Sequence, residues 1–150
     1  MDIVLALGGG GAKGFAHIGV LQVLEREGFH VRALAGTSAG GMAASAYAAG
    51  YRADEIAEHV LKTDPASLFP VHFGDKPAIM GLEGVAKVIS ELLGERTFDD
   101  LLLPCVLTAV DLDSGQPVLL HEGRVVDAVL ATVAIPGIFP PQRWGGYTLV

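Results

Sequence analysis

Hydrophobic positions along the chain fall into short continuous runs and longer amphipathic stretches, and the two kinds alternate. Residues 3–7 (IVLAL) form a continuous apolar run, which is typical of a strand buried in a parallel sheet. Phe15, Ile18, Leu21 and Leu24 recur at helical spacing, and Gly28 is a typical residue to end that helix. Strands are predicted at residues 3–7, 31–35, 105–110, 118–121 and 147–150, and helices at residues 12 or 13 to 27, 39–49, 54–62, 82–93 and 125–133.

This order of strands and helices predicts one α/β layered domain over residues 1–150, with a mostly parallel central sheet. The hydrophobic content, 51% of 150 residues, is enough for one core. A turn at residues 113–115 joins two of the strands in a hairpin. Two stretches are predicted to be irregular, namely residues 63–80, which include three prolines, and the Pro/Gly-rich loop at residues 136–146.

The charge pattern excludes some classes of function. The formal net charge is −7 and no cluster of Lys or Arg is present, so nucleic-acid binding is not expected. The negative charge also disfavours attraction to anionic membranes, although peripheral membrane contact through apolar loops stays open. No apolar run reaches the roughly 20 residues of a membrane span, and the first residues lack the basic start of a signal peptide, so a cytoplasmic protein is expected.

The single cysteine, Cys105, has no disulfide partner within the chain. Its apolar neighbours indicate a core residue rather than a catalytic thiol. No spacing of His, Cys and Asp indicates a metal site, and no cofactor is predicted. The sequence does not indicate an oligomeric state.

Two glycine-rich turns follow the first two predicted strands and are candidate active-site elements. The second is GTSAG, residues 36–40, which matches the G-x-S-x-G pattern of a nucleophile elbow with Ser38 at its centre. In such a turn Gly36 and Gly40 leave room for a tight backbone, and the serine hydroxyl projects near the positive end of the next helix. Because the chain is rich in glycine, a turn in which Ser38 or Thr37 merely caps the helix is the alternative interpretation.

The first glycine-rich turn is GGGGAKG, residues 8–14. Gly9, Gly11 and Gly14 fit the dinucleotide pattern G-x-G-x-x-G, but the second strand ends without the carboxylate that would bind a ribose. A P-loop is not matched, because Lys13 is followed by glycine rather than Ser or Thr. The remaining interpretation is a loop of backbone N–H groups that holds the oxyanion of an acyl-transfer reaction. A non-catalytic nucleotide-binding or regulatory module of Rossmann-like α/β fold stays the alternative.

The two glycine turns, DLDSG at residues 111–115 and ATVAIPGIFPP at residues 131–141 follow one another in an order that resembles the bacterial patatin-like phospholipases. The resemblance implies a three-layer, α/β-hydrolase-like domain that hydrolyses lipid or small esters through a Ser-Asp dyad and an acyl-enzyme, as a phospholipase A, lysophospholipase or esterase. An acyltransferase using the same serine is not distinguished. The resemblance assigns Ser38 as nucleophile, and its oxyanion hole falls on Gly9, Gly10 and Gly11; Gly14, Gly36 and Gly40 are the motif glycines. The N–H of Ala39 is a further candidate for the oxyanion hole. Lys13 is a candidate phosphate contact, and a solvated or carboxylate-paired lysine at a helix start is the alternative.

The resemblance places the catalytic aspartate in an Asp-Gly-Gly or Asp-Gly-Ala motif immediately after Val150, so the chain is expected to be the front part of a longer domain, and inactive as it stands. Asp111 and Asp113 are more typical of residues that shape a turn than of a base. His17, near the glycine loop, is interpreted as structural. His121 gives the order Ser-Asp-His of a triad, but it lies in a predicted hairpin strand rather than in a loop.

Residues 63–80 carry large apolar side chains that a simple linker does not need. One hypothesis is a mobile flap over Ser38 that admits lipid. The other is that these side chains pack onto the core of the domain. The residues concerned are Leu68, Phe69, Val71 and Phe73.

Overall fold

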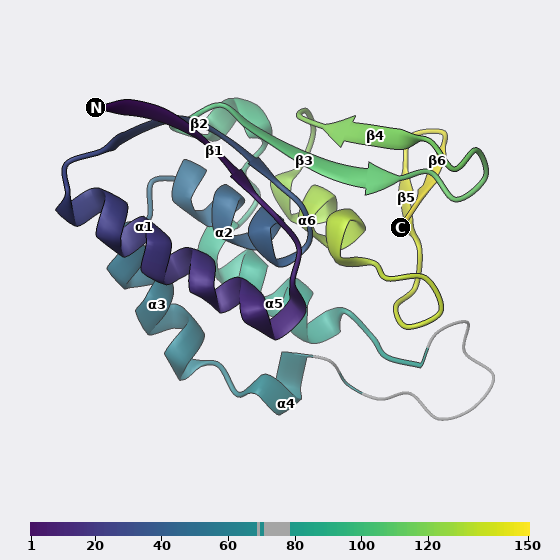
Figure 1. Ribbon diagram of the computed structural model, residues 1–150. Helices are drawn as coiled ribbons and strands as arrows, with labels where there is room; N and C mark the ends of the chain where they lie inside the picture. The colour runs from purple at the N-terminus through teal and green to yellow at the C-terminus, as the bar shows by residue number, and fades with distance from the viewer. Residues whose placement is uncertain (69, 71–78) are drawn as a thin grey trace.

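A four-stranded sheet runs through the computed structural model, which describes residues 1–68, 70 and 79–150 (Figure 1). Its strands lie in the order β1 (Asp2–Leu7), β2 (His30–Gly36), β3 (Cys105–Val110) and β4 (Pro117–Leu120). The first three strands are parallel, and β4 returns antiparallel to β3 in the predicted hairpin. The prediction of an α/β fold with a mostly parallel central sheet is confirmed.

Helices α1 to α6 all lie against one face of this sheet (Figure 1). They are α1 (Ala16–Arg26), α2 (Ala39–Ala48), α3 (Ala53–Lys62), α4 (Pro65–Leu68), α5 (Glu83–Leu93) and α6 (Val125–Val133). The alanine-rich α2 contacts β1, β2 and β3 directly, and α6 contacts β3. Helices α3 and α5 pack outside α2. The small side chains of α2, such as Ala44 and Ala48, are fully buried, and they allow this helix to lie close to the strands.

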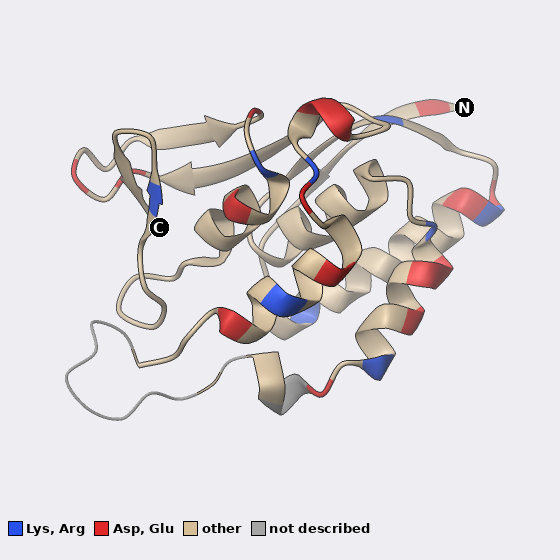
Figure 2. Ribbon diagram, turned by 180° about the vertical axis from the view of Figure 1, so that it is seen from behind, with Lys and Arg blue, Asp and Glu red and all other residues tan. Residues whose placement is uncertain are grey.

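The opposite face of the sheet is exposed among the described residues, and it carries apolar side chains beside the ion pairs of Asp2 with His30 and Arg32. Val4 is 69% exposed, Leu119 62% and Val110 41%. Figure 2 shows that the charged residues lie mostly on helices and turns; within the sheet, Asp2 lies on β1 and Arg32 on β2, whereas β3 and β4 carry none. The strand predicted at residues 3–7 is present, but the prediction that it is buried on both faces is wrong. β1 is an edge strand whose alternate side chains face away from the helices.

Four segments differ from the predicted elements. The helix expected from residue 12 or 13 begins as a 3₁₀ turn, η1 (Gly11–Phe15), because glycine at positive φ (Gly11, +52°) interrupts a regular start. A further 3₁₀ turn, η2 (Phe98–Asp100), was not predicted. The stretch predicted to be irregular from residue 63 contains α4, and the loop at 136–146 contains β5 (Gln142–Trp144).

The last strand, β6 (Tyr147–Leu149), pairs with β5 rather than with a strand of the main sheet. It also reaches the end of β3, because Val110 and Val150 exchange two backbone hydrogen bonds of 2.8 and 2.9 Å. The segment that ends at Val150 therefore lies beside the carboxyl end of β3. This is the edge of the sheet at which the parallel strand β2 also ends.

Candidate active site

Ser38 lies in the turn between β2 and α2, with a backbone conformation that non-glycine residues rarely adopt. Its φ is +52° and its ψ −124°, and it is the one non-glycine residue with positive φ in the part of the chain that the structure describes. Such a conformation costs about 1 to 3 kcal/mol and persists only where its surroundings hold it. The tight strand-to-helix turn predicted from GTSAG is therefore present, with the serine at its strained position.

Glycine is required on both sides of Ser38 because backbone segments meet there. A Cβ atom on Gly40 would overlap the carbonyl oxygen of Leu7, at the end of β1. A Cβ atom on Gly36 would lie 2.6 Å from the Cα atom of Gly41, closer than real side chains come. The two motif glycines thus allow α2 to begin directly against β1 and β2.

Polar contacts from distant segments hold the turn in place. The Ser38 N–H donates to Oγ1 of Thr132 in α6 (2.9 Å), and the Thr132 hydroxyl donates to the carbonyl oxygen of Thr108 in β3 (2.6 Å). The hydroxyls of Thr37 and Thr108 share a hydrogen bond of 2.6 Å, and the Thr37 N–H donates to Leu7 (3.0 Å). Sequence reasoning missed Thr108 and Thr132. No periodicity marks them, and only the occurrence of Thr132 within ATVAIPGIFPP was a signal.

Those contacts also bear on the alternative that the turn only caps a helix. Ser38 occupies the N-cap position of α2, yet its side chain makes no capping hydrogen bond. The hydroxyl of Thr37 pairs with Thr108 instead. Neither residue acts as the side-chain cap that this alternative requires.

The glycine loop before η1 runs alongside Ser38. A Cβ atom on Gly9 would lie 3.5 Å from Cβ of Ser38, which is ordinary van der Waals contact. Gly14 lies so close to Ala39 that a side chain there would overlap the Ala39 Cβ atom. His17 donates from Nε2 to the Gly8 carbonyl (2.8 Å), so it supports the loop as a structural residue. The structure thus brings together the two glycine turns that the sequence analysis singled out.

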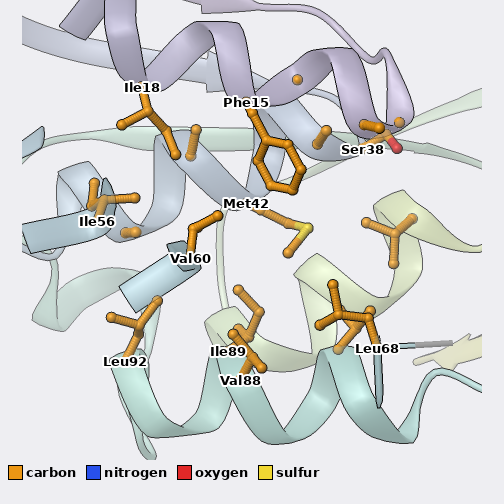
Figure 3. A pocket seen from close by; sticks show the side chains of 18 of the residues that line it. Phe15, Ile18, Ser38, Met42, Ile56, Val60, Leu68, Val88, Ile89 and Leu92 are labelled. Atoms are coloured by element: carbon orange, nitrogen blue, oxygen red, sulfur yellow. The ribbon is translucent and has the colours of Figure 1, made fainter. Parts of the chain in front are cut away.

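An apolar pocket of about 400 Å³ opens beside Ser38 (Figure 3). Its described walls come from η1, from α1 to α5, from the last residue of α6 and from the segment that follows α6. Figure 3 shows Ser38 at one end, Met42 in the middle, and Ile56 and Leu92 at the other end. The volume falls within the range of about 300 to 1,000 Å³ that ligand pockets commonly have.

Leu68 is the described part of the segment for which a lipid-access flap or core packing was predicted. It lies in α4 and lines the pocket. Phe69, Val71 and Phe73, on which both hypotheses also rest, lie outside the described residues.

Asp111 is buried in the turn after β3, where its carboxylate is occupied by hydrogen bonds within the turn and to β6. Its carboxylate accepts hydrogen bonds from the hydroxyl of Ser114 (2.6 Å), from the Ser114 N–H (3.1 Å) and from the Thr148 N–H (3.2 Å). These bonds, above all the one from the Ser114 side chain, hold the pKa of Asp111 below its ordinary value of 3.8. Asp111 therefore shapes its turn, as predicted, and fastens β6 to the end of β3.

The remaining candidates lie apart from the turn. Asp113 is exposed in the same turn as Asp111. His121 follows β4, whose last residue, Leu120, pairs with Leu107 on β3. Leu107 in turn pairs with Gly36, so His121 lies two strands, or about 10 Å, to the side of β2.

Three further residues are placed by the structure without a role in the reaction. Lys13 is exposed on η1 and stays only a predicted phosphate contact. Burial raises the pKa of the Cys105 thiol to about 12, so this side chain stays protonated in the core. His59 faces Glu91 across α3 and α5, with 3.6 Å between Nε2 and Oε2. Among the described residues no group of three or more His, Cys, Asp or Glu could hold a metal ion.

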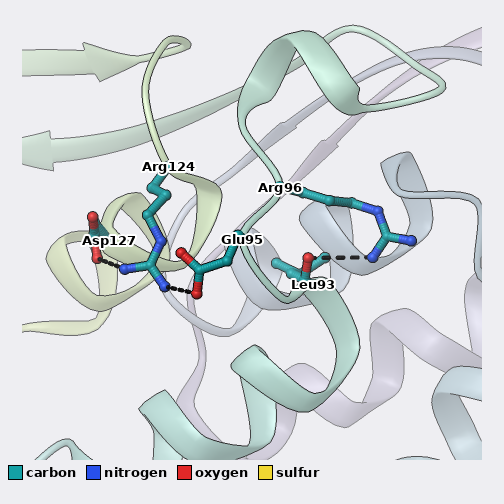
Figure 4. A network of polar contacts seen from close by, with 5 residues as sticks. All are labelled: Leu93, Glu95, Arg96, Arg124 and Asp127. Atoms are coloured by element: carbon teal, nitrogen blue, oxygen red, sulfur yellow. Dashed lines mark hydrogen bonds and ion pairs between the residues drawn. The ribbon is translucent and has the colours of Figure 1, made fainter.

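A polar network joins α5, which lines the pocket, to α6 (Figure 4). Arg124, at the start of α6, donates to Glu95 (2.8 Å) and to Asp127 (3.4 Å). Arg96 donates to the carbonyl of Leu93 (3.2 Å) at the end of α5. The network fixes the end of α5 against the start of α6.

Fold and site together define an α/β protein with a strained serine between strand and helix, a glycine loop beside it and an apolar pocket at its side. The family model of the patatin-like phospholipases matches residues 5–150. The chain therefore belongs to the patatin-like phospholipase family, and at the level of the family this supports a lipid hydrolase. No helix in the described residues is long and apolar enough to cross a membrane.

Relatives agree with this assignment, and a solved structure agrees with the fold. An uncharacterized NTE family protein of Mycobacterium tuberculosis is 32% identical over 149 residues, which are 98% of this chain and 41% of that protein. The mouse patatin-like phospholipase domain-containing protein 6 is 31% identical over 93% of this chain and 11% of its own length. The crystal structure of VipD from Legionella pneumophila is similar in fold, with a TM-score of 0.60 and 13% identity over 99% of this chain and 44% of that one. The chain thus spans less than half the length of these proteins.

Proposed function

We propose that this chain carries the nucleophile of a serine lipid acyl hydrolase, and that the nucleophile is Ser38. The observation that carries the proposal is the strained turn of Ser38 at the mouth of an apolar pocket, with the glycine loop in contact on its other side. A strained conformation that several contacts hold in place is a common feature of functional residues. The pocket supplies the surface that the apolar part of a lipid needs.

In the proposed reaction, the Ser38 oxygen attacks the acyl carbonyl carbon and forms a new C–O bond. Backbone N–H groups of Gly9, Gly10 and Gly11, together with that of Ala39, stabilise the oxyanion that develops. Ala39 is the first residue of α2, and the first N–H groups of a helix have no partner within the helix. The bond to the leaving alcohol then breaks, and water hydrolyses the acyl-enzyme to release the acid. An acyltransferase would differ only in using an alcohol in place of this water.

The base that we propose is an aspartate directly after Val150, as the resemblance to the family implies. It would take the proton of the serine hydroxyl and pass it to the leaving alcohol. Two observations support this location. Val150 lies beside Val110 at the carboxyl end of β3, the edge of the sheet where β2 leads into Ser38. Of the acidic and basic groups described nearby, Asp111 binds Ser114 and Thr148, and His17 binds the Gly8 carbonyl.

The pocket also favours an acyl group over a nucleotide as the ligand beside the glycine loop. Ser38 is the single polar side chain among the described residues that line it. A phosphate or ribose placed there would lose its hydrogen bonds to water without replacement, which costs several kcal/mol. A nucleotide-binding module is therefore the weaker candidate.

A fluorophosphonate probe tests the nucleophile in the protein that contains these 150 residues. Such a probe labels an activated serine covalently, so Ser38→Ala should abolish both labelling and the hydrolysis of p-nitrophenyl esters. Ser90→Ala is the control, because this serine lies on α5 and does not line the pocket. Unchanged labelling of the Ser38→Ala protein would show that another residue is the nucleophile.

A further inference from the structure

We propose that the pocket beside Ser38 binds the acyl chain of a medium-chain ester, and that Ala46 at its inner end limits the length of the chain. The inference rests on Ser38 being the nucleophile and adds the class of acyl group that the site accepts. It is carried by the shape and chemistry of the pocket.

The pocket changes in character along its length. At the Ser38 end, the lining residues Phe15 and Ile135 are 53% and 48% exposed, so this end opens to solvent. At the other end, Ile18, Ile56 and Leu92 are buried and Val60 is partly buried, so this end is more enclosed than the Ser38 end. A pocket with a reactive hydroxyl at its open end and only apolar side chains at its closed end suits an ester whose acyl chain points inward.

Helix α2 gives the length of this pocket. Ala39, Met42, Ala43 and Ala46 all line it, and their spacing of three and four residues places them on one face of the helix. From Ala39 to Ala46 the helix rises about 10 Å, at about 1.5 Å per residue. Carbon–carbon single bonds of about 1.5 Å in an extended zigzag advance about 1.3 Å per atom, so this distance corresponds to an acyl chain of about eight carbons.

Small residues on α2 create the space in which the chain would lie. Ala43 and Ala46 present only a methyl group each to the pocket, and Ala46 is 1% exposed. Met42 lies halfway along, and its unbranched side chain can adjust to the ligand. A larger side chain at position 46 would occupy the inner end and leave the mouth and Ser38 unchanged.

The test is a chain-length profile of kcat/KM on p-nitrophenyl esters with acyl groups of two to sixteen carbons, measured on the protein that contains this chain. For the unchanged protein we expect a maximum near eight carbons. Ala46→Leu fills the inner end, and because each buried CH₂ group is worth roughly a factor of four, kcat/KM for the eight-carbon ester should fall at least about tenfold. The two-carbon ester should change less than about twofold, since it does not reach position 46. Ala57→Leu is the matched control, because Ala57 lies on α3 outside the pocket and should keep the profile unchanged.

A binding measurement separates failure of this inference from failure of the proposed function. Calorimetric titration of the Ser38→Ala protein with sodium octanoate needs no catalysis, and adding Ala46→Leu should weaken binding at least about tenfold. If the activity depends on Ser38 but the Ala46→Leu protein has the same chain-length profile as the unchanged protein, the inference about Ala46 is wrong and Ser38 remains the nucleophile. If no activity depends on Ser38 but octanoate binding is sensitive to position 46, the pocket is an acyl site and the proposed reaction is wrong. Absence of octanoate binding would overturn the acyl pocket.

Discussion

The two ends of the site are built in opposite ways, although one lies in the turn that leads into α2 and the other along α2 itself. At the N-terminal turn, Gly36 and Gly40 are in such close contact with neighbouring backbone that neither leaves room for a Cβ atom. Along the flank of the same helix, alanines face a pocket of about 400 Å³. The turn is fixed by polar bonds from β3 and α6, whereas the pocket has apolar walls. The difference indicates that the position of Ser38 must be fixed where the ester bond would be broken, whereas the acyl chain needs open space along α2.

The largest effect is expected from a single methyl group added at the turn. Gly40→Ala should destabilise the protein by about 3 kcal/mol, because its Cβ would overlap the Leu7 carbonyl and the rigid backbone on both sides cannot move away. Urea unfolding measures this change. Gly19→Ala is the control, because the same methyl group on α1 meets nothing within 4 Å. There alanine should stabilise the helix by about 0.5 to 1 kcal/mol. Equal effects at both positions would show that the turn is not closely packed.

A smaller effect is expected when the polar support of the turn is removed. Thr132→Val keeps the shape of the side chain but removes the acceptor for the Ser38 N–H, and it should cost about 1.5 kcal/mol. The rate of fluorophosphonate labelling should fall as well, because the strained turn loses a contact that holds it. Thr132→Ser retains the hydroxyl and should restore most of that rate. A Thr132→Val protein that is labelled at the original rate would show that this hydrogen bond does not position Ser38.

The smallest effect concerns pH and the edge of the sheet near the turn. Because the pKa of Asp111 is lowered in the folded protein, its carboxylate adds stability at pH values above about 3.8, and this contribution is lost as the pH falls through the folded-state pKa. Asp111→Asn should therefore be less stable than the unchanged protein at pH 7, and the difference should narrow at pH 3. Urea unfolding at the two pH values checks it. Asp113→Asn, at the exposed neighbour, should change the stability at pH 7 little. A constant difference for Asp111→Asn across this range would contradict the assignment.

Local patterns in the sequence determined most elements and both glycine turns. The strands that became β2 and β3, the hairpin to β4 and the helices α2, α3, α5 and α6 follow from apolar runs, helical spacing and turn residues, which act within a few residues of one another. The G-x-S-x-G pattern also located the strained serine, because only small neighbours permit so tight a turn. The start of the first helix was misplaced, since Gly11 takes a positive φ and the chain begins with a 3₁₀ turn before the regular helix.

Tertiary structure alone decided what surrounds Ser38. Thr132 lies 94 residues from Ser38 in the chain and bonds its backbone N–H, and Thr108 bonds Thr132 and the neighbouring Thr37. No local sequence pattern predicts these contacts. β1 is exposed because it lies at the edge of the sheet and because the helices cover only one face of the sheet. The apolar run at residues 3–7 indicates neither of these facts. The pocket exists because α1, α3 and α5 pack around the alanine face of α2, so its volume depends on the distances between helices that are far apart in sequence. Sequence patterns specify elements because their causes are local, whereas a cavity and its walls depend on the packing of the whole domain.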